Sequence, residues 1–75
     1  MSTPAERRQQ ATKFGRNLKR LRAGAGLTQE GLAERADMSA VYVRQVELGM
    51  RLPSVAIAKA LRKGLGVSWD DLMSF

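Results

Sequence analysis

Residues 28–49, TQEGLAERADMSAVYVRQVELG, decide the fold of this chain. Thr28 and Ser39 are both suited to the N-cap of a helix, because a hydroxyl oxygen can accept a hydrogen bond from a free backbone N–H of the first turn. Two candidate helices begin at these residues, and the three turn residues 37–39 lie between them. Gly49 is favourable at the end of the second helix. The pattern predicts two short helices joined by a tight turn, which is a helix-turn-helix.

The second helix of this motif must form against its local propensity. Residues 41–43 and Val46 are β-branched or aromatic, and such residues are enriched in strands. Every neighbouring segment carries helix signals, so a strand here would have no partner, and we expect tertiary packing to impose the helix. A helix over residues 39–48 would direct Val43 and Val46 into the core. Its opposite face would present Val41, Arg44, Gln45 and Leu48.

A first helix is expected upstream of the motif. The stretch TPAE at residues 3–6 is a capping box with proline at the first helical position, so the helix can begin there. Gly24 and Gly26 favour its end. Residues 1–12 are polar and form either part of this helix or a frayed extension, which leaves residues 13–75 as the helix-turn-helix domain.

Two further helices are expected downstream. Ser54 would cap a fourth helix, and Gly64 and Gly66 would weaken or end it, because a glycine inside a helix costs about 1 kcal/mol relative to alanine. The stretch SWDD at residues 68–71 has the pattern of a capping box before a short fifth helix. These segments together predict a compact all-α domain of five helices. Its core would come from Phe14, Leu18, Leu21, Leu32, Ala33, Ala36, Ala58, Leu61 and Leu65.

The composition excludes several classes of site. The chain has 75 residues with no Cys and no His, which excludes disulfides, Cys/His zinc sites and catalysis by cysteine or histidine. Glu30 and Glu34 are one helical turn apart but have no basic or metal-binding partner in the pattern, so we expect them to be solvated. We expect no catalytic site, no metal, no cofactor and no small-molecule ligand. No membrane span or signal peptide is visible, and a cytoplasmic protein is expected.

The charge is high and unevenly distributed. The formal net charge is +6, and residues 1–27 hold seven basic residues against the single acidic residue Glu6. Residues 28–47 hold two basic and four acidic residues, whereas residues 48–75 hold four basic and two acidic residues. A small basic domain favours a polyanionic partner, most often nucleic acid.

Three stretches resemble the lambda-repressor-like helix-turn-helix family, which includes the Cro/repressor and xenobiotic-response-element regulators. They are LRAGAGLTQEGLAERADMS at residues 21–39, YVRQVELGMRLPS at 42–54 and LGVSWDDL at 65–72, and the resemblance runs from about Phe14 to Met73. It implies a sequence-specific transcriptional regulator that binds double-stranded DNA as a homodimer at a two-fold operator. The controller proteins of restriction–modification systems and small phage Cro-like repressors are similar.

Several positions depart from the family pattern, among them Ala58 and Gly64, where larger residues or better helix formers are usual. Gly31 stands where an acidic residue often completes a capping box with Thr28, and Asp37 replaces the usual glycine of the turn. Aspartate tolerates the left-handed backbone conformation better than most residues. We therefore expect these changes to affect stability more than fold.

The resemblance implies a role for each outward residue of the recognition helix, residues 39–48, in the major groove. Arg44 can bond guanine and Gln45 can bond adenine, each in a bidentate way. Val41 can contact a thymine methyl group, and Ala40 occupies a position that often contacts a base. Each could instead be ordinary helix surface, and Arg44 could instead pair with a nearby glutamate. The residues expected at DNA phosphates are Gln29, Ser39, Tyr42, Arg51 and Arg16.

The resemblance also implies contacts that hold the domain and its dimer together. Arg22 and Glu47 are expected to form an ion pair that ties the first helix to the recognition helix. The end of the chain is unusually apolar, and the part that does not cover the core is a candidate dimer surface. The dimer candidates are Val67, Trp69, Leu72, Met73 and Phe75.

A rival hypothesis keeps the fold and changes the partner. An antitoxin-like interaction module would bury Val41 and Leu48 against another protein, and replacing Arg44 by alanine would hardly affect its function. In a DNA-binding regulator the same replacement would relax specificity at one base pair.

Overall fold

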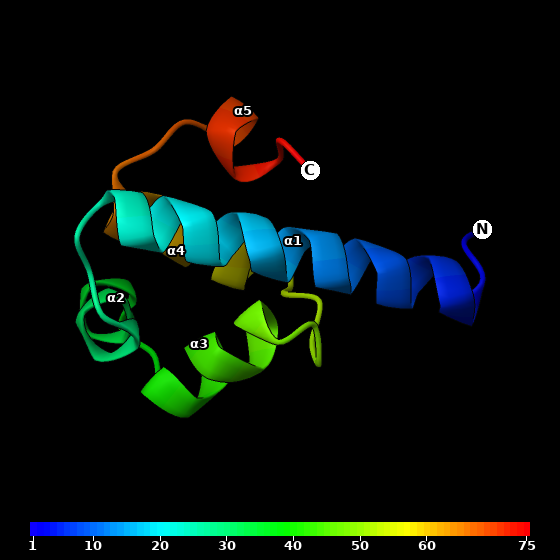
Figure 1. Cartoon of the computed structure of the whole chain (residues 1–75), viewed down its shortest axis with the longest axis horizontal. Helices are drawn as coiled ribbons and strands as arrows, with labels where there is room; N and C mark the ends of the chain where they lie inside the picture. The colour runs from blue at the N-terminus through cyan, green and yellow to red at the C-terminus, as the bar shows by residue number, and fades with distance from the viewer.

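The computed structural model describes all 75 residues, and its regular elements are all helices. The helices are α1 (Pro4–Gly24), α2 (Gln29–Ala36), α3 (Ala40–Glu47), α4 (Val55–Leu65) and α5 (Trp69–Leu72). Figure 1 shows α1 crossing the whole molecule, with α2 and α3 on one side of it, α5 on the other and α4 behind. The prediction of an all-α five-helix domain is confirmed. None of the helices has both the length and the apolar character needed to cross a lipid bilayer.

Each helix begins after a hydroxyl residue whose oxygen accepts a backbone N–H of the first turn. These N-cap residues are Thr3, Thr28, Ser39, Ser54 and Ser68. Only the cap at Thr3 is a complete capping box, because the Glu6 carboxylate also accepts from the Thr3 N–H at 3.2 Å. At Ser68 only the bond from the Asp71 N–H forms, at 3.0 Å. The expected second capping box is therefore only half formed, and aspartate is one methylene shorter than the glutamate that usually closes it.

The helix ends follow the expected turn chemistry, with one difference. Asp37 ends α2 in the left-handed conformation (φ 55°, ψ 51°), as expected of the residue that replaces the usual turn glycine. Gly66 ends α4 in the same conformation. Gly64 does not end α4, and it lies inside the helix against α2, where a Cβ would be 3.4 Å from the Cβ of Ala36. The absence of a side chain at this position lets the two helices approach closely.

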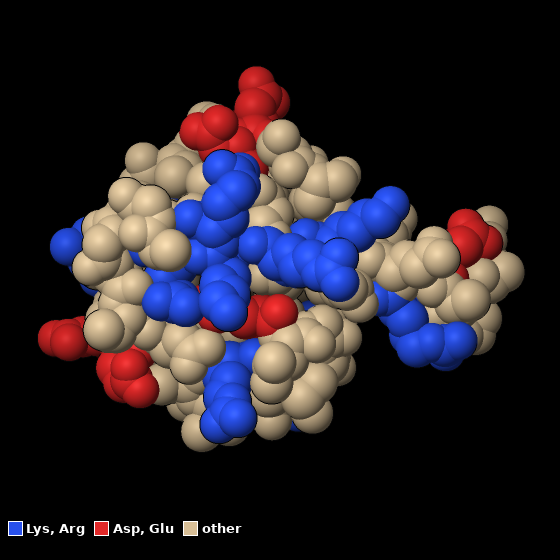
Figure 2. All heavy atoms as spheres, viewed as in Figure 1, with Lys and Arg blue, Asp and Glu red and all other residues tan.

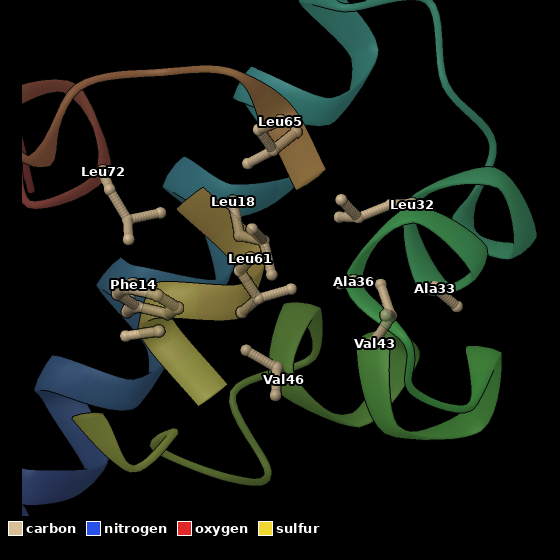
Figure 3. Packing of buried hydrophobic residues seen from close by; sticks show 11 residues of the cluster. Phe14, Leu18, Leu32, Ala33, Ala36, Val43, Val46, Leu61, Leu65 and Leu72 are labelled. Atoms are coloured by element: carbon tan, nitrogen blue, oxygen red, sulfur yellow. The ribbon is translucent and has the colours of Figure 1, made fainter. Parts of the chain in front are cut away.

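The core is one cluster of buried apolar side chains from all five helices (Figure 3). Val43 and Val46 are both 0% exposed, which confirms the expected inward face of α3. Leu72 is also 0% exposed and points into the cluster, so the prediction that Leu72 forms part of a dimer surface is wrong. Burying a leucine or valine side chain in this way contributes about 1.5–3 kcal/mol. The full cluster comprises Phe14, Leu18, Leu32, Ala33, Ala36, Val43, Val46, Ala58, Leu61, Leu65 and Leu72.

Two glycines let α1 approach the end of α3 at backbone distance. A Cβ at Gly15 would collide with the carbonyl oxygen of Val46 and would lie 2.6 Å from that of Glu47. A Cβ at Gly49, whose φ is +77°, would lie 3.0 Å from the Cα of Thr12. These contacts fix the direction in which the N-terminal half of α1 runs past the recognition helix.

A buried amide joins α1 to the end of the chain. Asn17 is 6% exposed, and its Nδ2 donates hydrogen bonds to the carbonyl oxygens of Asp71 (3.0 Å) and Leu72 (2.8 Å). Both carbonyls lie at the C-terminus of α5, where the last carbonyls have no partner within the helix itself. The Phe75 ring then packs edge-on against Phe14 at a centroid distance of 5.5 Å. The last segment of the chain is therefore held on α1 by both polar and apolar contacts.

Candidate nucleic-acid interface

The face of α3 that points away from the core is exposed and mixes apolar with polar side chains. Val41 is 65% exposed and Leu48 is 61% exposed, although both are large apolar residues. They line a shallow hollow of about 250 Å³ together with Arg44, Gln45 and Met50. The structure thus brings together three of the four residues expected at DNA bases. Ala40, the fourth, is partly buried and packs against the core.

A loop residue orients part of this face. Arg51 donates from Nε to the Oε1 of Gln45 at 2.7 Å, and its guanidinium group lies 5.7 Å from the centre of the Tyr42 ring. A carbonyl oxygen has two lone pairs, so Gln45 keeps one acceptor site and both amide N–H groups for another partner. Contact between the arginine and the aromatic ring adds a cation–π attraction. The sequence named these three residues as separate contacts, whereas the structure joins them into one group.

The opposite side of α3 is held by an ion pair with ideal fork geometry. Arg22 of α1 donates to Glu47 from Nε at 2.6 Å and from Nη2 at 3.1 Å, so the structure contains the expected pair. The two side chains are only 13% and 3% exposed. Gln29 donates to the same carboxylate at 3.0 Å, and Arg22 also donates to the Leu27 carbonyl at 2.7 Å. Three helices are therefore joined at Glu47.

The Arg22 side of the ion pair keeps its positive charge at neutral pH. The hydrogen bonds that Arg22 donates to Glu47 raise the pKa of Arg22 above its already high usual value, against an opposing effect of burial. A base whose pKa is raised on folding contributes stability at all pH values below its unfolded pKa, and that stability is lost only as pH rises through the folded pKa. The position of α3 is therefore expected to stay fixed at neutral pH.

The remaining residues expected at phosphates are placed differently from one another. Gln29 lies at the first turn of α2 with its amide already bonded to Glu47, and Ser39 caps α3 through the Tyr42 N–H at 3.1 Å. Arg16 lies elsewhere, on an exposed side of α1 where it lines a groove with the C-terminal residue Phe75. The basic residues that share a groove with the loop after α3 are instead Arg7 and Arg8, which sequence analysis did not single out.

The positive charge of the molecule is almost entirely unpaired. Arg22–Glu47 is the only ion pair within 4.0 Å among 13 basic residues. Figure 2 shows basic side chains gathered across α1, with acidic side chains over α2 and α5, in a small patch beside the basic cluster and at the N-terminal end of α1. Unpaired surface charges of one sign create a field that attracts a polyanion at long range.

A second exposed apolar surface lies at the C-terminal end. Trp69, Met73 and Phe75 are 39%, 47% and 48% exposed. Arg62 of α4 stacks over the Trp69 ring at 5.4 Å. Val67, another dimer candidate, is partly buried against the core. The structure therefore leaves three of the five expected dimer residues on the surface.

Two residues that hold α1 against its neighbours were not predicted from the sequence. Gly15 was hidden inside the α1 pattern, although an isolated glycine within a helix is a signal of close packing. Asn17 was hidden in the same way among basic residues, and only its burial shows that it bonds the end of α5.

Comparison with known proteins identifies one family, and the similar proteins agree with that family. The helix-turn-helix (HTH_3) family model matches residues 18–72. The uncharacterized HTH-type transcriptional regulator y4dJ of Sinorhizobium fredii is 40% identical over 60 residues, which are 80% of this chain and 78% of that protein. The uncharacterized HTH-type transcriptional regulator YazB of Bacillus subtilis is 37% identical over 59 residues, covering 79% and 86%.

A solved structure extends the likeness to the fold. The restriction-modification controller protein C.AhdI from Aeromonas hydrophila superposes with a TM-score of 0.80 at 35% sequence identity. The match covers 83% of this chain and 94% of that one. The arrangement of helices around α3 is thus that of a known controller protein.

Proposed function

Because this chain belongs to the helix-turn-helix family of transcriptional regulators, we propose that it binds a two-fold symmetric DNA operator as a homodimer with α3 in the major groove. The observation that carries the proposal is the asymmetry of α3. One side is locked to α1 and α2 through Glu47, and the other side is exposed with polar groups free to bond. A rigid helix with an exposed polar face suits the major groove, which admits an α-helix and displays a distinct pattern for each base pair.

Sequence recognition would come from Arg44, Gln45 and Val41. Arg44 has no ion-pair partner and is exposed, so its guanidinium group is free to bond guanine O6 and N7. Gln45 would donate to a base acceptor while Arg51 holds its carbonyl oxygen. Val41 would pack on a thymine methyl group. Each bidentate pair would discriminate against the wrong base by about 1–3 kcal/mol.

Phosphate contacts would set the register of α3 on the duplex. The N-terminus of α2 carries partial positive charge beside Gln29, and Ser39 and Tyr42 have hydroxyl groups that can donate to phosphate oxygens. Arg51 keeps donors beyond the one bonded to Gln45. These contacts position the helix without carrying sequence information.

Dimer formation would use the exposed apolar surface of Trp69, Met73 and Phe75. A two-fold dimer presents two recognition helices to half-sites about 34 Å apart, which explains why the operator would be palindromic. Together with the likeness to C.AhdI, this favours a controller-type regulator whose DNA occupancy rises steeply with its own concentration through dimerisation.

The test is selection of bound duplexes from a random DNA pool, with wild type and Arg44→Ala side by side. We expect wild type to enrich one two-fold symmetric site, and Arg44→Ala to enrich the same site with one position per half-site relaxed. Ultracentrifugation of the complex should give two chains per site. Absence of any enriched site, with only weak salt-sensitive binding, would contradict the proposal.

A second candidate function is supported by the apolar residues of the recognition face, the exposed surface formed by Val41, Arg44, Gln45, Leu48 and Met50. Val41, Leu48 and Met50 are each more than 60% exposed, at 65%, 61% and 67%. A protein partner that buried them would make the chain an antitoxin-like interaction module. In that case Val41→Asp would abolish complex formation while Arg44→Ala would leave it intact.

A further inference from the structure

We propose that the first two turns of α1, with Arg7 and Arg8, form a flank that binds the DNA backbone outside the base pairs read by α3. This inference rests on the proposed function, since it lengthens the contact made by the recognition face. It adds Arg7 and Arg8 to the phosphate contacts and gives a role to a segment that lies outside residues 18–72, the part matched by the family model.

The flank is joined to the recognition face through one residue. Arg7 and Arg8 line a groove of about 360 Å³ with Pro4 and Ala11 on one wall, and the opposite wall is the loop after α3, with Gly49, Met50 and Leu52. Met50 also lines the hollow that contains Arg44 and Gln45. One continuous surface therefore runs from the base-contacting side chains, over Met50, to the two arginines.

The flank has a fixed position relative to α3. Gly15 and Gly49 bring α1 into backbone contact with the end of α3, so the helix cannot pivot there without separating packed main chains. The N-terminus of α1 is closed by the capping box between Thr3 and Glu6, which favours a formed helix through Arg7 and Arg8. Binding to the flank would then cost little ordering of the backbone.

The chemistry of the groove matches a sugar–phosphate backbone. The Arg8 side chain has no hydrogen-bond or ion-pair partner, and the Arg7 side chain uses only one Nη1 donor, to the Ser2 carbonyl at 2.9 Å. The nearest acid in the sequence, Glu6, is occupied by the Thr3 N–H. Phosphate oxygens would bond the two guanidinium groups, and the apolar face of a deoxyribose would pack on Met50 and Leu52, which are exposed by 67% and 46%.

The experiment measures how steeply DNA affinity falls with salt. Each lost phosphate contact makes the negative slope of log K against log[salt] less steep by about 0.9. The test variant is Arg7→Gln/Arg8→Gln. The matched control is Lys59→Gln/Lys63→Gln, which removes the same charge from exposed positions one turn apart on α4. We expect the slope of the test variant to be less steep by about 0.9 for each arginine per bound chain. The control should keep a slope near the wild-type value.

A duplex-length series distinguishes a flanking contact from general attraction. Wild type should bind the selected operator more tightly when several base pairs of arbitrary sequence are added at each end, and the Arg7→Gln/Arg8→Gln variant should lose this gain. Thermal unfolding checks that both double variants fold as wild type does. Equal slopes for test and control variants, or no gain from longer ends in wild type, would overturn the inference.

The outcome is separable from that of the proposed function. If selection enriches no operator, the salt series is run on a random-sequence duplex, where phosphate contacts act without base recognition. A reduced slope for the test variant would then support the flank even though sequence-specific recognition had failed. An enriched operator with an unchanged slope would retain the regulator and reject the flank.

Discussion

The two faces of α3 carry similar apolar residues and meet opposite surroundings. Val43 and Val46 are 0% exposed and pack in the core, whereas Val41 and Leu48 on the other side are 65% and 61% exposed. The inner pair follows from the need of a small domain to bury apolar surface. The outer pair remains largely outside the core of the single chain. Core packing therefore explains the inner residues of α3 and does not explain the outer ones.

The largest predicted effect comes from breaking the ion pair between Arg22 and Glu47, which holds α3 against α1. In Glu47→Ala, Arg22 keeps its charge in a site that is only 13% exposed and loses its carboxylate partner. Breaking a buried ion pair in this way costs about 3–5 kcal/mol. We expect the free energy of unfolding in urea to fall by about 3 kcal/mol. A loss below about 1 kcal/mol would show that the pair is not needed to place α3.

A smaller loss of stability is expected where α1 touches the inner side of α3. In Gly15→Ala the new methyl group would meet the Val46 and Glu47 carbonyls, and overpacking of this kind costs about 1–3 kcal/mol. Gly24→Ala is the control, since a Cβ there has no neighbour within 4 Å. Alanine at Gly24 should be neutral or stabilise the helix by up to about 1 kcal/mol. Thermal melts of the two variants that coincide would refute the close approach of α1 and α3.

The smallest expected effect on stability is at Val41, on the exposed face of α3, and Val46 on the buried face is the comparison. Val46→Ala should lower the free energy of unfolding by about 2 kcal/mol, because the buried methyl groups leave a cavity. Val41→Ala should change it by less than about 0.5 kcal/mol, as for most surface positions. The order should reverse in DNA binding, where Val41→Ala weakens the complex although the protein stays folded. Equal stability losses would mean that Val41 is part of the core.

Much of the fold follows from local patterns that sequence shows directly. Hydroxyl residues at all five N-caps and the turn residue Asp37 are local signals, and the structure uses each of them. The inward positions of α3 follow from helical periodicity once the segment is taken as a helix. Leu72 was misassigned because exposure is not a local property. A chain end with six apolar residues does not reveal which of them the core can accept.

The residues of the candidate site could be predicted from the sequence, but most of the contacts between them could not. Arg44, Gln45 and Val41 share one face of a helix, which spacing alone indicates. The bond between Arg51 and Gln45 joins a loop to a helix, and only folding of the loop decides it. Arg8 and Arg16 lie two turns apart on α1 and line one hollow along it, yet Arg16 also borders the C-terminus and Arg8 also borders the loop after α3.

Capped helices, the helix-turn-helix motif and a charge suited to a polyanion all follow directly from the sequence. These properties depend on neighbours within a few residues or on simple sums of charge. The burial of Leu72 in the core and the position of Arg7 and Arg8 beside the recognition face depend on tertiary packing. The reason is physical: Gly15 and Gly49 set the approach of α1 to α3, and packing between distant segments cannot be deduced from either segment alone.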